Sequence, residues 1–220
     1  MRASGSWKHK ISHFFSESTV TGPLAVLIII FILLSIFVPK FLSFRSATGI
    51  INAATLTGTL TVGVALLMIS GEFDLSVGSL MAVGGYIYGG LSIAGQPVLG
   101  LILAILVPAL LGAVNGIILV WTGIPSFIVT LGTKYLYRGL LWVVTAGTML
   151  QTVDRLPIYN LFNGRFDLLN QFFPDANFRN SLIWLLFLVL IFQLILSRTR
   201  FGNHVFAVGG NAGAALGQGV

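Results

Sequence analysis

The sequence predicts an all-α protein, a polytopic bundle of about six transmembrane helices. Hydrophobic residues make up 56% of the 220 residues and charged residues only 8%, whereas a soluble domain carries about 25% charged residues. The 26 glycines lie inside apolar stretches rather than in linkers, and small residues let membrane helices approach closely. Because so few charges cannot cover a water-exposed surface, the apolar excess is expected to face lipid.

Six apolar stretches, separated by polar breaks, account for the predicted spans. The first ends at Pro39 without the small residues of a signal-peptide cleavage site, so it is interpreted as a membrane helix. The second is rich in hydroxyl and small side chains, which suit helix packing or a polar path better than lipid contact. The predicted spans are 22–38, 49–70, 75–94, 97–121, 126–147 and 181–197.

Two GxxxG pairs predict close helix contacts. Gly85 and Gly89 lie in the third span, and Gly112 and Gly116 lie in the fourth. Such pairs mark one face of a membrane helix for a near neighbour. Asn115 lies between the second pair, and it is interpreted either as a side chain that joins helices or as a ligand contact.

Basic residues that flank the spans predict the orientation, because they accumulate on the cytoplasmic side of membrane proteins. With the N-terminal tail in the cytoplasm, six spans return residues 198–220 to the cytoplasm and leave a polar loop at about 148–180 outside. Lys40 and Arg45 fall on the outer side, a mild exception. The residues that favour cytoplasmic termini are Arg2, Lys8, Lys10, Arg198 and Arg200.

The N-terminal tail, residues 1–21, has its own pattern. Trp7, Ile11 and Phe14 repeat at helical spacing among polar and basic residues. This pattern indicates a short amphipathic helix on the membrane surface, with a disordered tail as the alternative.

Several kinds of chemistry are excluded by the sequence. There is no cysteine, the three histidines lie near the two ends of the chain, and no GxxxxGK[ST] phosphate loop is present. The lysines and arginines are scattered between apolar stretches, so they cannot follow a nucleic-acid backbone. The sequence therefore predicts no enzyme, no cofactor, no metal site and no nucleic-acid partner.

The segment SGEFDLSVG places two carboxylates, Glu72 and Asp74, between apolar stretches. Asp74 is predicted to cap a helix that begins at Leu75, and both carboxylates are interpreted as interface or path residues, since charges within a bilayer are costly. Lys134 and Arg138 are four residues apart and share one helix face, where they either reach an interface or pair with a carboxylate.

Three segments, taken in order and spacing, resemble the monosaccharide-type ABC permeases, which include ribose, xylose and autoinducer permeases. They are GEFDLSVGSLMAVGG, AVNGIILVWTGIPSFIVTLGTKYLYRGL and RFGNHVFAVGGNAGAA. The resemblance covers about residues 49–220. It implies a permease dimer in the bacterial inner membrane, often a homodimer, with a separate ATPase subunit and a periplasmic solute-binding protein. Transport of a sugar-like solute would proceed by alternating access, powered by the ATPase.

The resemblance also implies two sets of site residues. A broken or re-entrant helix fits the DLSVGS and GIPSFIVTLGT segments, since unwound backbone is tolerated where it lines a cavity. The expected substrate-path residues are Asn52, Thr55, Asp74, Ser76, Asn115, Pro125 and Phe127. The expected ATPase-coupling residues are Arg200, Gly202, Gly209, Gly210, Asn211 and Ala215.

Members of that family are usually longer than this chain, so the sequence is expected to be C-terminally truncated within or just after the coupling region, 198–220. Two alternatives stay open: a non-functional fragment of such a permease, and a secondary transporter. A secondary transporter would need ion-coupling carboxylates in mid-span, and Glu72 and Asp74 are the only candidates.

Overall fold

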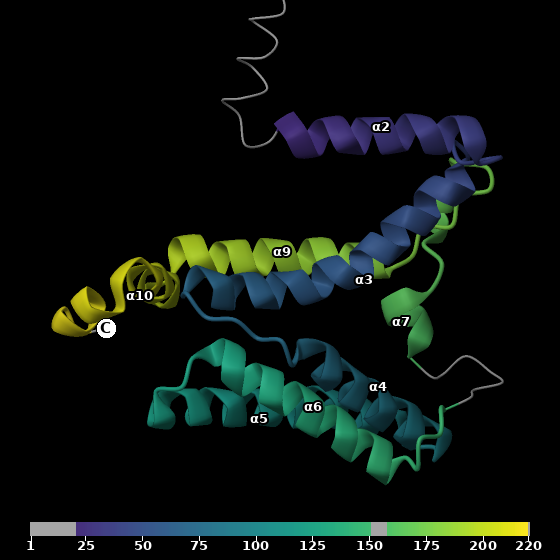
Figure 1. Ribbon diagram of the computed structural model, residues 1–220. Helices are drawn as coiled ribbons and strands as arrows, with labels where there is room; N and C mark the ends of the chain where they lie inside the picture. Colours follow the sequence, from purple (N-terminus) through teal and green to yellow (C-terminus); the bar gives the residue numbers. More distant parts are fainter. Residues whose placement is uncertain (1–20, 151–157, 220) are drawn as a thin grey trace, which may run out of the picture.

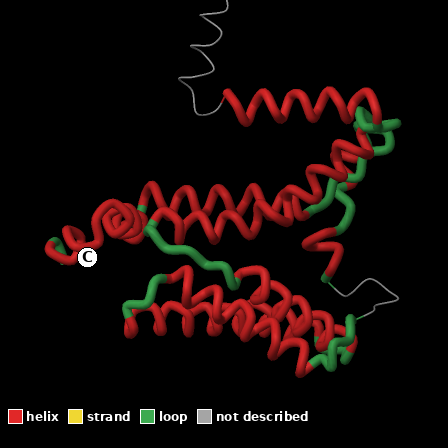
Figure 2. The backbone as a smooth tube through the Cα atoms, viewed as in Figure 1, coloured by secondary structure: helices red, strands yellow, loops and turns green. Residues whose placement is uncertain are grey.

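The computed structural model describes residues 21–150 and 158–219, whose regular secondary structure is all helical, with one isolated β-bridge between Arg165 and Arg179 in a connecting segment. The expected amphipathic helix within residues 1–21 lies almost wholly outside the described residues. The all-α class is confirmed (Figures 1 and 2). The helices are α2 (Thr21–Phe37), α3 (Phe44–Ile69), α4 (Val77–Ile93), α5 (Pro97–Thr122), α6 (Ser126–Val144), α7 (Tyr159–Asn163), α8 (Asp167–Asn170), α9 (Ser181–Arg198) and α10 (Arg200–Gly217).

Among the described helices, α3, α5 and α9 are long and apolar enough to cross a membrane, and α2 and α4 are shorter apolar helices. Their outward side chains are mostly apolar and exposed, as on α2 from Leu24 to Phe37. The few buried side chains are largely hydroxyl or amide groups. This pattern, polar inside and apolar outside, is typical of helices that pack together within lipid.

The helices form two packed groups. In one group α4, α5 and α6 contact one another, and in the other α9 packs against both α3 and α10. In Figure 1 the C-terminal ends of α3 and α9 lie beside α10 and that of α5 lies on the same side of the molecule, while α4 and α6 end on the opposite side, where α7 lies. We call these the α10 end and the α7 end.

The α4–α5 contact depends on glycine, although at different positions from those that the GxxxG pairs predict. A Cβ on Gly84 would lie 2.7 Å from the Ala104 carbonyl oxygen and 3.2 Å from the Pro108 ring, whereas Gly85 has nothing within 4 Å. Gly116 is also open. The pairs predict the right helices, but among their four glycines only Gly112 meets the other helix, at 4.0 Å from Leu80 Cδ1. The close approach to backbone is made by Gly84, one residue before the predicted Gly85.

The α3–α4 connection is not a simple turn at the end of the bundle. α4 starts part way along α5 and α6 (Figure 1), because residues 70–76 run back from the α10 end before the helix begins. Ser76 lies beside Asn115, seven residues before the end of α5 at Thr122, or about 10 Å along a helix.

Asp74 does not cap α4, so that prediction is wrong. The helix begins at Val77 after Ser76, which makes no side-chain cap bond. Asp74 Oδ1 instead accepts hydrogen bonds from Ser76 N at 2.7 Å and from Ser76 Oγ at 2.6 Å. An aspartate that bonds the backbone two residues later forms its own local turn, and this turn delays the start of the helix.

Residues 158–180 form a cap at the α7 end. α7 packs against α9, and Trp184 Nε1 donates to the Leu161 carbonyl at 3.0 Å. Within the cap, Asn170 pairs with Phe178 through two bonds, from Nδ2 to the Phe178 carbonyl (2.9 Å) and from the Phe178 amide to Oδ1 (2.8 Å). The cap, which contains only short helices, is therefore held in place by specific hydrogen bonds.

Candidate functional site

A chain of four side chains joins the break before α4 to the middle of α5 and α6. Tyr137 Oη donates to Asn115 Oδ1 at 2.8 Å, Asn115 Nδ2 donates to Ser76 Oγ at 2.9 Å, and Ser76 Oγ donates to Asp74 Oδ1 at 2.6 Å. Ser76, Asn115 and Tyr137 are 0%, 4% and 5% exposed. We call this chain the Asp74 network, and every donor in it points toward the carboxylate.

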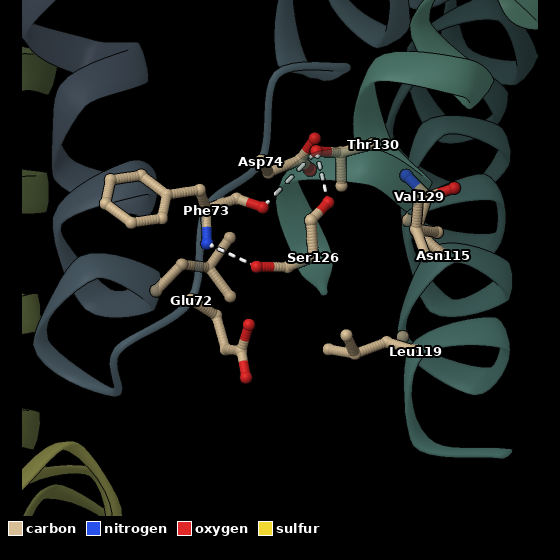
Figure 3. Close-up of a pocket in the computed structure, with 11 residues that line it drawn as sticks. Glu72, Phe73, Asp74, Asn115, Leu119, Ser126, Val129 and Thr130 are labelled. Carbon is tan, nitrogen blue, oxygen red and sulfur yellow. Dashed lines mark hydrogen bonds between the residues drawn. The ribbon is translucent and has the colours of Figure 1, made fainter. Parts of the chain in front are cut away.

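The backbone just before the network is held by α6. Phe73 N donates to Ser126 Oγ at 3.1 Å, and Thr130 Oγ1 lies 3.4 Å from the Phe73 carbonyl oxygen (Figure 3). Thr130 also donates to the Ser126 carbonyl at 2.7 Å, so its single proton goes mainly to α6 itself. Ser126 and Thr130 are both buried. These bonds satisfy non-helical backbone that lipid could not hydrate.

A second link fastens α4 to α6 one turn further on. Ser79 Oγ donates to the Lys134 carbonyl at 2.9 Å, and Ser79 is buried. The start of α4 is thus attached to α5 through Asn115 and to α6 through hydroxyl groups.

Beside the network is a small cavity of about 100 Å³, which would hold several water molecules. Figure 3 shows Glu72, Phe73 and Asp74 from the break facing Asn115 and Leu119 of α5 and Ser126 of α6. Its polar atoms are two carboxylates, an amide and hydroxyl groups. Such groups donate and accept hydrogen bonds to an uncharged polar solute. They contain no nucleophile paired with a base.

The structure brings together three of the seven expected substrate-path residues: Asp74, Ser76 and Asn115. Pro125 immediately precedes Ser126 at the start of α6 and so fixes where that helix begins. Phe127, the next residue after Ser126, is 54% exposed and has no part in the hydrogen bonds of the network.

Asn52 and Thr55 lie apart from the Asp74 network, nearer the α7 end. Asn52 Nδ2 donates to the Asn177 carbonyl at 2.8 Å, and the Thr55 hydroxyl donates to the Ile51 carbonyl of its own helix. Both residues line a second cavity of about 500 Å³ between α3, α4 and the cap, which Arg179 also lines. The sequence-predicted path residues therefore fall into two separate polar regions.

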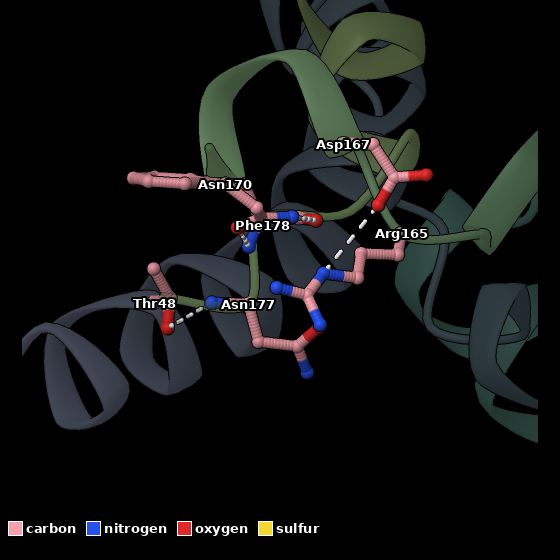
Figure 4. Close-up of polar contacts among 6 residues, drawn as sticks. All are labelled: Thr48, Arg165, Asp167, Asn170, Asn177 and Phe178. Carbon is pink, nitrogen blue, oxygen red and sulfur yellow. Dashed lines mark hydrogen bonds and ion pairs between the residues drawn. The ribbon is translucent and has the colours of Figure 1, made fainter. Parts of the chain in front are cut away.

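Thr48, one turn before Asn52, completes the attachment of the cap to α3. Thr48 Oγ1 accepts from Asn177 N at 3.2 Å (Figure 4). Thr48 and Asn52 together hold both backbone groups of Asn177, and we call this pair the outer clamp. On the cap, the Arg179 guanidinium donates to Tyr159 Oη at 2.7 Å and to the Asn163 carbonyl at 3.0 Å.

The expected coupling residues lie on α10, which turns sharply away from α9. Thr199 Oγ1 caps the helix by accepting from Gly202 N at 3.2 Å. Gly202 is buried, and a Cβ there would overlap the Leu196 carbonyl. A Cβ on Gly209 would overlap the Ile69 carbonyl at the end of α3, whereas Gly210 has open space.

Asn211 divides α10 into two helical pieces. Its backbone is extended (φ −163°, ψ 101°), and its Oδ1 accepts from Ala214 N at 3.0 Å, which caps the second piece. Ala215 in that piece is buried, while Arg200 begins the first piece and is exposed. The structure therefore explains why glycine is needed at position 209, where a Cβ would overlap α3, and why asparagine suits position 211, where it caps a helix. Among the described residues, no contact requires glycine at position 210.

The sequence does not single out three residues of the site, Ser126, Thr130 and Tyr137, although the first two lie within the GIPSFIVTLGT segment that is expected to line a cavity. Ser126 and Thr130 are spaced i, i+4 directly after the Gly-Ile-Pro break, a spacing that places two hydroxyls on one helix face. Tyr137 offers no comparable signal, because its partner Asn115 lies 22 residues away.

Comparison with known proteins places the chain in a family. Residues 46–220 match the family described as the branched-chain amino acid transport system permease component. The chain is 33% identical over 198 residues to the L-arabinose ABC transporter permease protein AraH of Azospirillum brasilense, covering 89% of this chain and 55% of that protein.

Two further relatives give the same result. The D-allose transport system permease protein AlsC of Escherichia coli is 31% identical over 201 residues, which is 90% of this chain and 57% of AlsC. The ribose import permease protein RbsC of Bacillus subtilis is 30% identical over 214 residues, which is 97% of this chain and 64% of RbsC. The chain thus spans between half and two thirds of the length of these relatives, and no solved structure matches it. Its match from residue 46 to residue 220 shows that the chain belongs to this family of multi-pass membrane permease components.

Proposed function

We propose that the chain is part of the membrane permease subunit of an ABC importer for a simple sugar or sugar-like solute. The observation that carries the proposal is the similarity, along nearly the whole chain, to permeases named for arabinose, allose and ribose. The Asp74 network supports it, since its carboxylate, amide and hydroxyl groups suit a solute with many hydroxyls.

In this proposal α2, α3, α4, α5, α6 and α9 are six membrane crossings. Their alternating directions and the basic residues of the two tails support cytoplasmic termini. Residues 1–21 are then a cytoplasmic tail, 22–197 the transmembrane domain with an extracytoplasmic loop at about 148–180, and 198–220 the cytoplasmic coupling region. The α10 end faces the cytoplasm and the cap faces outward.

The proposed solute path includes Asp74 and Asn115, which line the cavity of about 100 Å³ (the inner cavity). Ser76 joins these two residues by hydrogen bonds, and the path also includes the neighbouring residues Pro125 and Phe127. Asn52 and Thr55 contribute from the cavity of about 500 Å³ between α3, α4 and the cap (the outer cavity). Alternating access would then expose the two polar regions in turn, and the break at residues 70–76 supplies a place where one helix group can move relative to the other.

The proposed partners are an ABC ATPase at α10, a second permease subunit, most simply a copy of this chain, and a periplasmic solute-binding protein at the cap. The ATPase contact is proposed at Arg200, Gly202, Gly209, Gly210, Asn211 and Ala215. The fit of Gly209 against the end of α3 supports a firmly seated α10, as a helix that transmits force between subunits requires.

The test is uptake of radiolabelled L-arabinose, D-allose and D-ribose by cells without their own importers for these sugars. The cells express the permease subunit of which the chain is part, together with the ABC ATPase and the periplasmic binding protein of the same importer. We expect uptake of at least one sugar, abolished when the phosphate-loop lysine of the ATPase is replaced. Uptake that persists with the inactive ATPase and collapses with the ion gradient would instead establish a secondary transporter.

A paired substitution tests the coupling contact. Gly209→Ala should displace α10 and reduce copurification of the ATPase, because the added methyl group meets backbone that cannot yield easily. Gly210→Ala, in open space next to it, should leave copurification unchanged. Equal copurification of the ATPase with both variants would mean that the ATPase does not depend on the seating of α10 against α3.

A further inference from the structure

Arg179 is a charged residue of the outer cavity that the sequence does not single out. Its side chain is half-buried and lines the cavity together with Asn52 and Thr59. One guanidinium nitrogen, Nη1, donates to Tyr159 Oη at 2.7 Å and to the Asn163 carbonyl at 3.0 Å. Both acceptors are uncharged, and no carboxylate of the described residues lies within 4.0 Å of the guanidinium. The outer cavity therefore contains a positive charge that no ion pair neutralises.

Glu72 and Asp74 give the inner cavity the opposite charge. Both carboxylates line it (Figure 3), and its described lining contains no lysine, arginine or histidine. Asp74 accepts two hydrogen bonds from Ser76, but both donors are uncharged. Glu72 has no ion pair within residues 21–150 and 158–219. Lys134 of α6 lies elsewhere, with its Nζ 5.7 Å from the centre of the Tyr135 ring, and it lines neither cavity.

The two cavities follow one another along a single face of α3. The lining of the outer cavity includes α3 residues from Asn52 to Leu60, and that of the inner cavity includes Leu67. Leu60 and Leu67 are seven residues apart, which is about two helical turns, or about 10 Å along the helix. A solute that moves along this face of α3 therefore meets the guanidinium in one cavity and the carboxylates in the other.

Two opposite charges in succession disfavour charged solutes of either sign. A cleft with low-dielectric walls focuses the field of the charges that line it, and lipid around the helices supplies such walls. An anion is attracted in the outer cavity and repelled in the inner one, whereas a cation is repelled first. An uncharged polar solute meets neither repulsion, and it can still bond to the same groups through its hydroxyls.

We propose that Arg179 makes the outer cavity electropositive, that Glu72 and Asp74 make the inner cavity electronegative, and that the two cavities in succession select uncharged polar solutes. Cations are held back at the outer cavity and anions at the inner cavity. The selection of a solute rests on the proposed transport function, whereas the opposite charges of the two cavities do not.

The chain has no cysteine, so an introduced thiol can report the charge of each cavity. Thr59→Cys places a thiol at an exposed position that lines the outer cavity. Gly116→Cys places one in the inner cavity, where a Cβ has nothing within 4 Å. Each single-thiol chain, purified in detergent micelles, reacts at low salt with an anionic, a cationic and an uncharged methanethiosulfonate. The measured quantity is the ratio of anionic to cationic rate constants, relative to that of a small thiol in solution.

The Thr59→Cys thiol should favour the anionic reagent and the Gly116→Cys thiol the cationic reagent. Arg179→Gln should lower the anionic preference by at least about fourfold, because a unit charge about 10 Å away changes the concentrations of the two reagents about twofold in opposite directions even at the dielectric constant of water. Glu72→Gln should lower the cationic preference of the inner thiol by a similar factor. Preferences of the same sign at both thiols, or ratios that neither substitution changes, would overturn the proposal.

Two controls separate the charge of Arg179 from its bonds within the cap. Arg179→Lys keeps the charge but not the guanidinium that bonds Tyr159 and Asn163, so the anionic preference should persist. Arg165→Gln removes an arginine of the same cap that is paired with Asp167 and lines neither cavity, so the ratio should not change. The uncharged reagent reports access to each thiol. Equal loss of the preference in Arg179→Lys and Arg179→Gln would make the shape of the cap, rather than its charge, the cause and would also overturn the proposal.

Solute selection is measured by uptake in the importer-expressing cells, with an amino derivative and a carboxylic acid derivative of the transported sugar that the binding protein is first shown to bind. Arg179→Gln should raise uptake of the amino derivative relative to the sugar, and Glu72→Gln that of the acid. Uptake of either derivative by the parent at the rate of the sugar itself would overturn the selection. If the thiol ratios are as expected but no variant takes up any sugar, the transport function fails and the opposite charges of the two cavities stand.

Discussion

Two regions of the molecule hold a non-helical residue by the same device, a pair of side chains one helical turn apart. At the break before α4, Ser126 and Thr130 of α6 meet the amide and carbonyl of Phe73. At the cap, Thr48 and Asn52 of α3 meet the amide and carbonyl of Asn177. In each pair the first residue accepts from the amide and the second donates to the carbonyl.

The two pairs of residues differ in bond length, in exposure to water and in the residues next to them. The outer clamp makes both of its bonds at good length, 3.2 and 2.8 Å, and holds an exposed residue in a cap that water can reach. The pair at the break, Ser126 and Thr130, which we call the inner clamp, makes one good bond of 3.1 Å and one long contact of 3.4 Å. However, it adjoins the Asp74 network, whose middle members are fully buried.

This difference predicts which substitutions should lower the free energy of unfolding most. At the cap, a lost protein bond can be replaced by one to water, which limits the cost. Within the helix group, Ser76 is 0% exposed and does not line the cavity, so water cannot readily replace a partner that its hydroxyl loses. We therefore expect substitutions in the Asp74 network to cost more than equivalent substitutions in the outer clamp, although the outer clamp has the better geometry.

The largest effect is expected for Asn115→Leu. This change removes the donor to Ser76 and the acceptor for Tyr137, while the side-chain volume is nearly kept. Buried groups left without partners cost about 1–3 kcal/mol each, but interhelical hydrogen bonds in membranes average only about 0.6 kcal/mol. We expect a loss of about 2 kcal/mol in the free energy of unfolding, measured by titration with SDS in mixed micelles.

Asn203→Leu provides the control for Asn115→Leu. Asn203 is exposed on α10, so the same chemical change there should leave the unfolding midpoint within error of that of the parent. If both variants shifted the midpoint equally, the general hydrophobicity of the chain, rather than the network, would be the cause.

A smaller loss is expected for Ser126→Ala. The Phe73 amide loses its acceptor, and α6 keeps its own helical bonds. We expect a cost of about 1 kcal/mol in the same SDS titration. Since Thr130 contributes little to Phe73, Thr130→Val should cost less at this site than Ser126→Ala. The reverse order would mean that the 3.4 Å contact is stronger than its length indicates.

Much of the fold follows from the sequence, because apolar stretches of membrane length can only be helices. The helix starts are less predictable. The second predicted span begins at residue 49, but α3 begins at Phe44, since Ser43 caps it by accepting from Ser46 N at 3.2 Å. Polar Arg45 and Ser46 lie in this first turn, where hydropathy alone does not indicate a helix.

The site was predicted in part for a related reason. Asp74 and Asn115 stand out as polar residues among apolar ones, so their presence in one cluster could be anticipated. Asn52 stands out equally, yet it holds the Asn177 carbonyl, 125 positions away, rather than joining that cluster. Polarity within a span indicates that a partner exists, but which partner depends on helix packing that the pattern does not encode.

At the outer clamp, Thr48→Val should cost only about 0.5 kcal/mol. Valine keeps the buried shape of Thr48 while the Asn177 amide loses its acceptor. Thr48 itself is buried, but Asn177 is exposed, so a small outward shift of the cap lets water replace the lost acceptor. The change should be visible locally as faster hydrogen exchange of the Asn177 amide, with the SDS midpoint almost unaltered. A midpoint shift as large as that of Ser126→Ala would contradict the proposed difference between the two regions.

The smallest effect is expected for the ion pair of the cap. Arg165 Nε lies 3.5 Å from Asp167 Oδ1, and the two side chains are 59% and 75% exposed (Figure 4). Exposed pairs of this kind contribute about 0–1 kcal/mol and are screened by salt. We expect Asp167→Asn to change neither the unfolding midpoint nor hydrogen exchange across residues 165–180, at low or at high salt. Asn170→Leu is the comparison within the same cap, since it removes both bonds to Phe178 from a buried side chain and should accelerate exchange there. If Asp167→Asn loosened the cap as much as Asn170→Leu did, charge rather than amide-to-backbone bonding would hold the outer region.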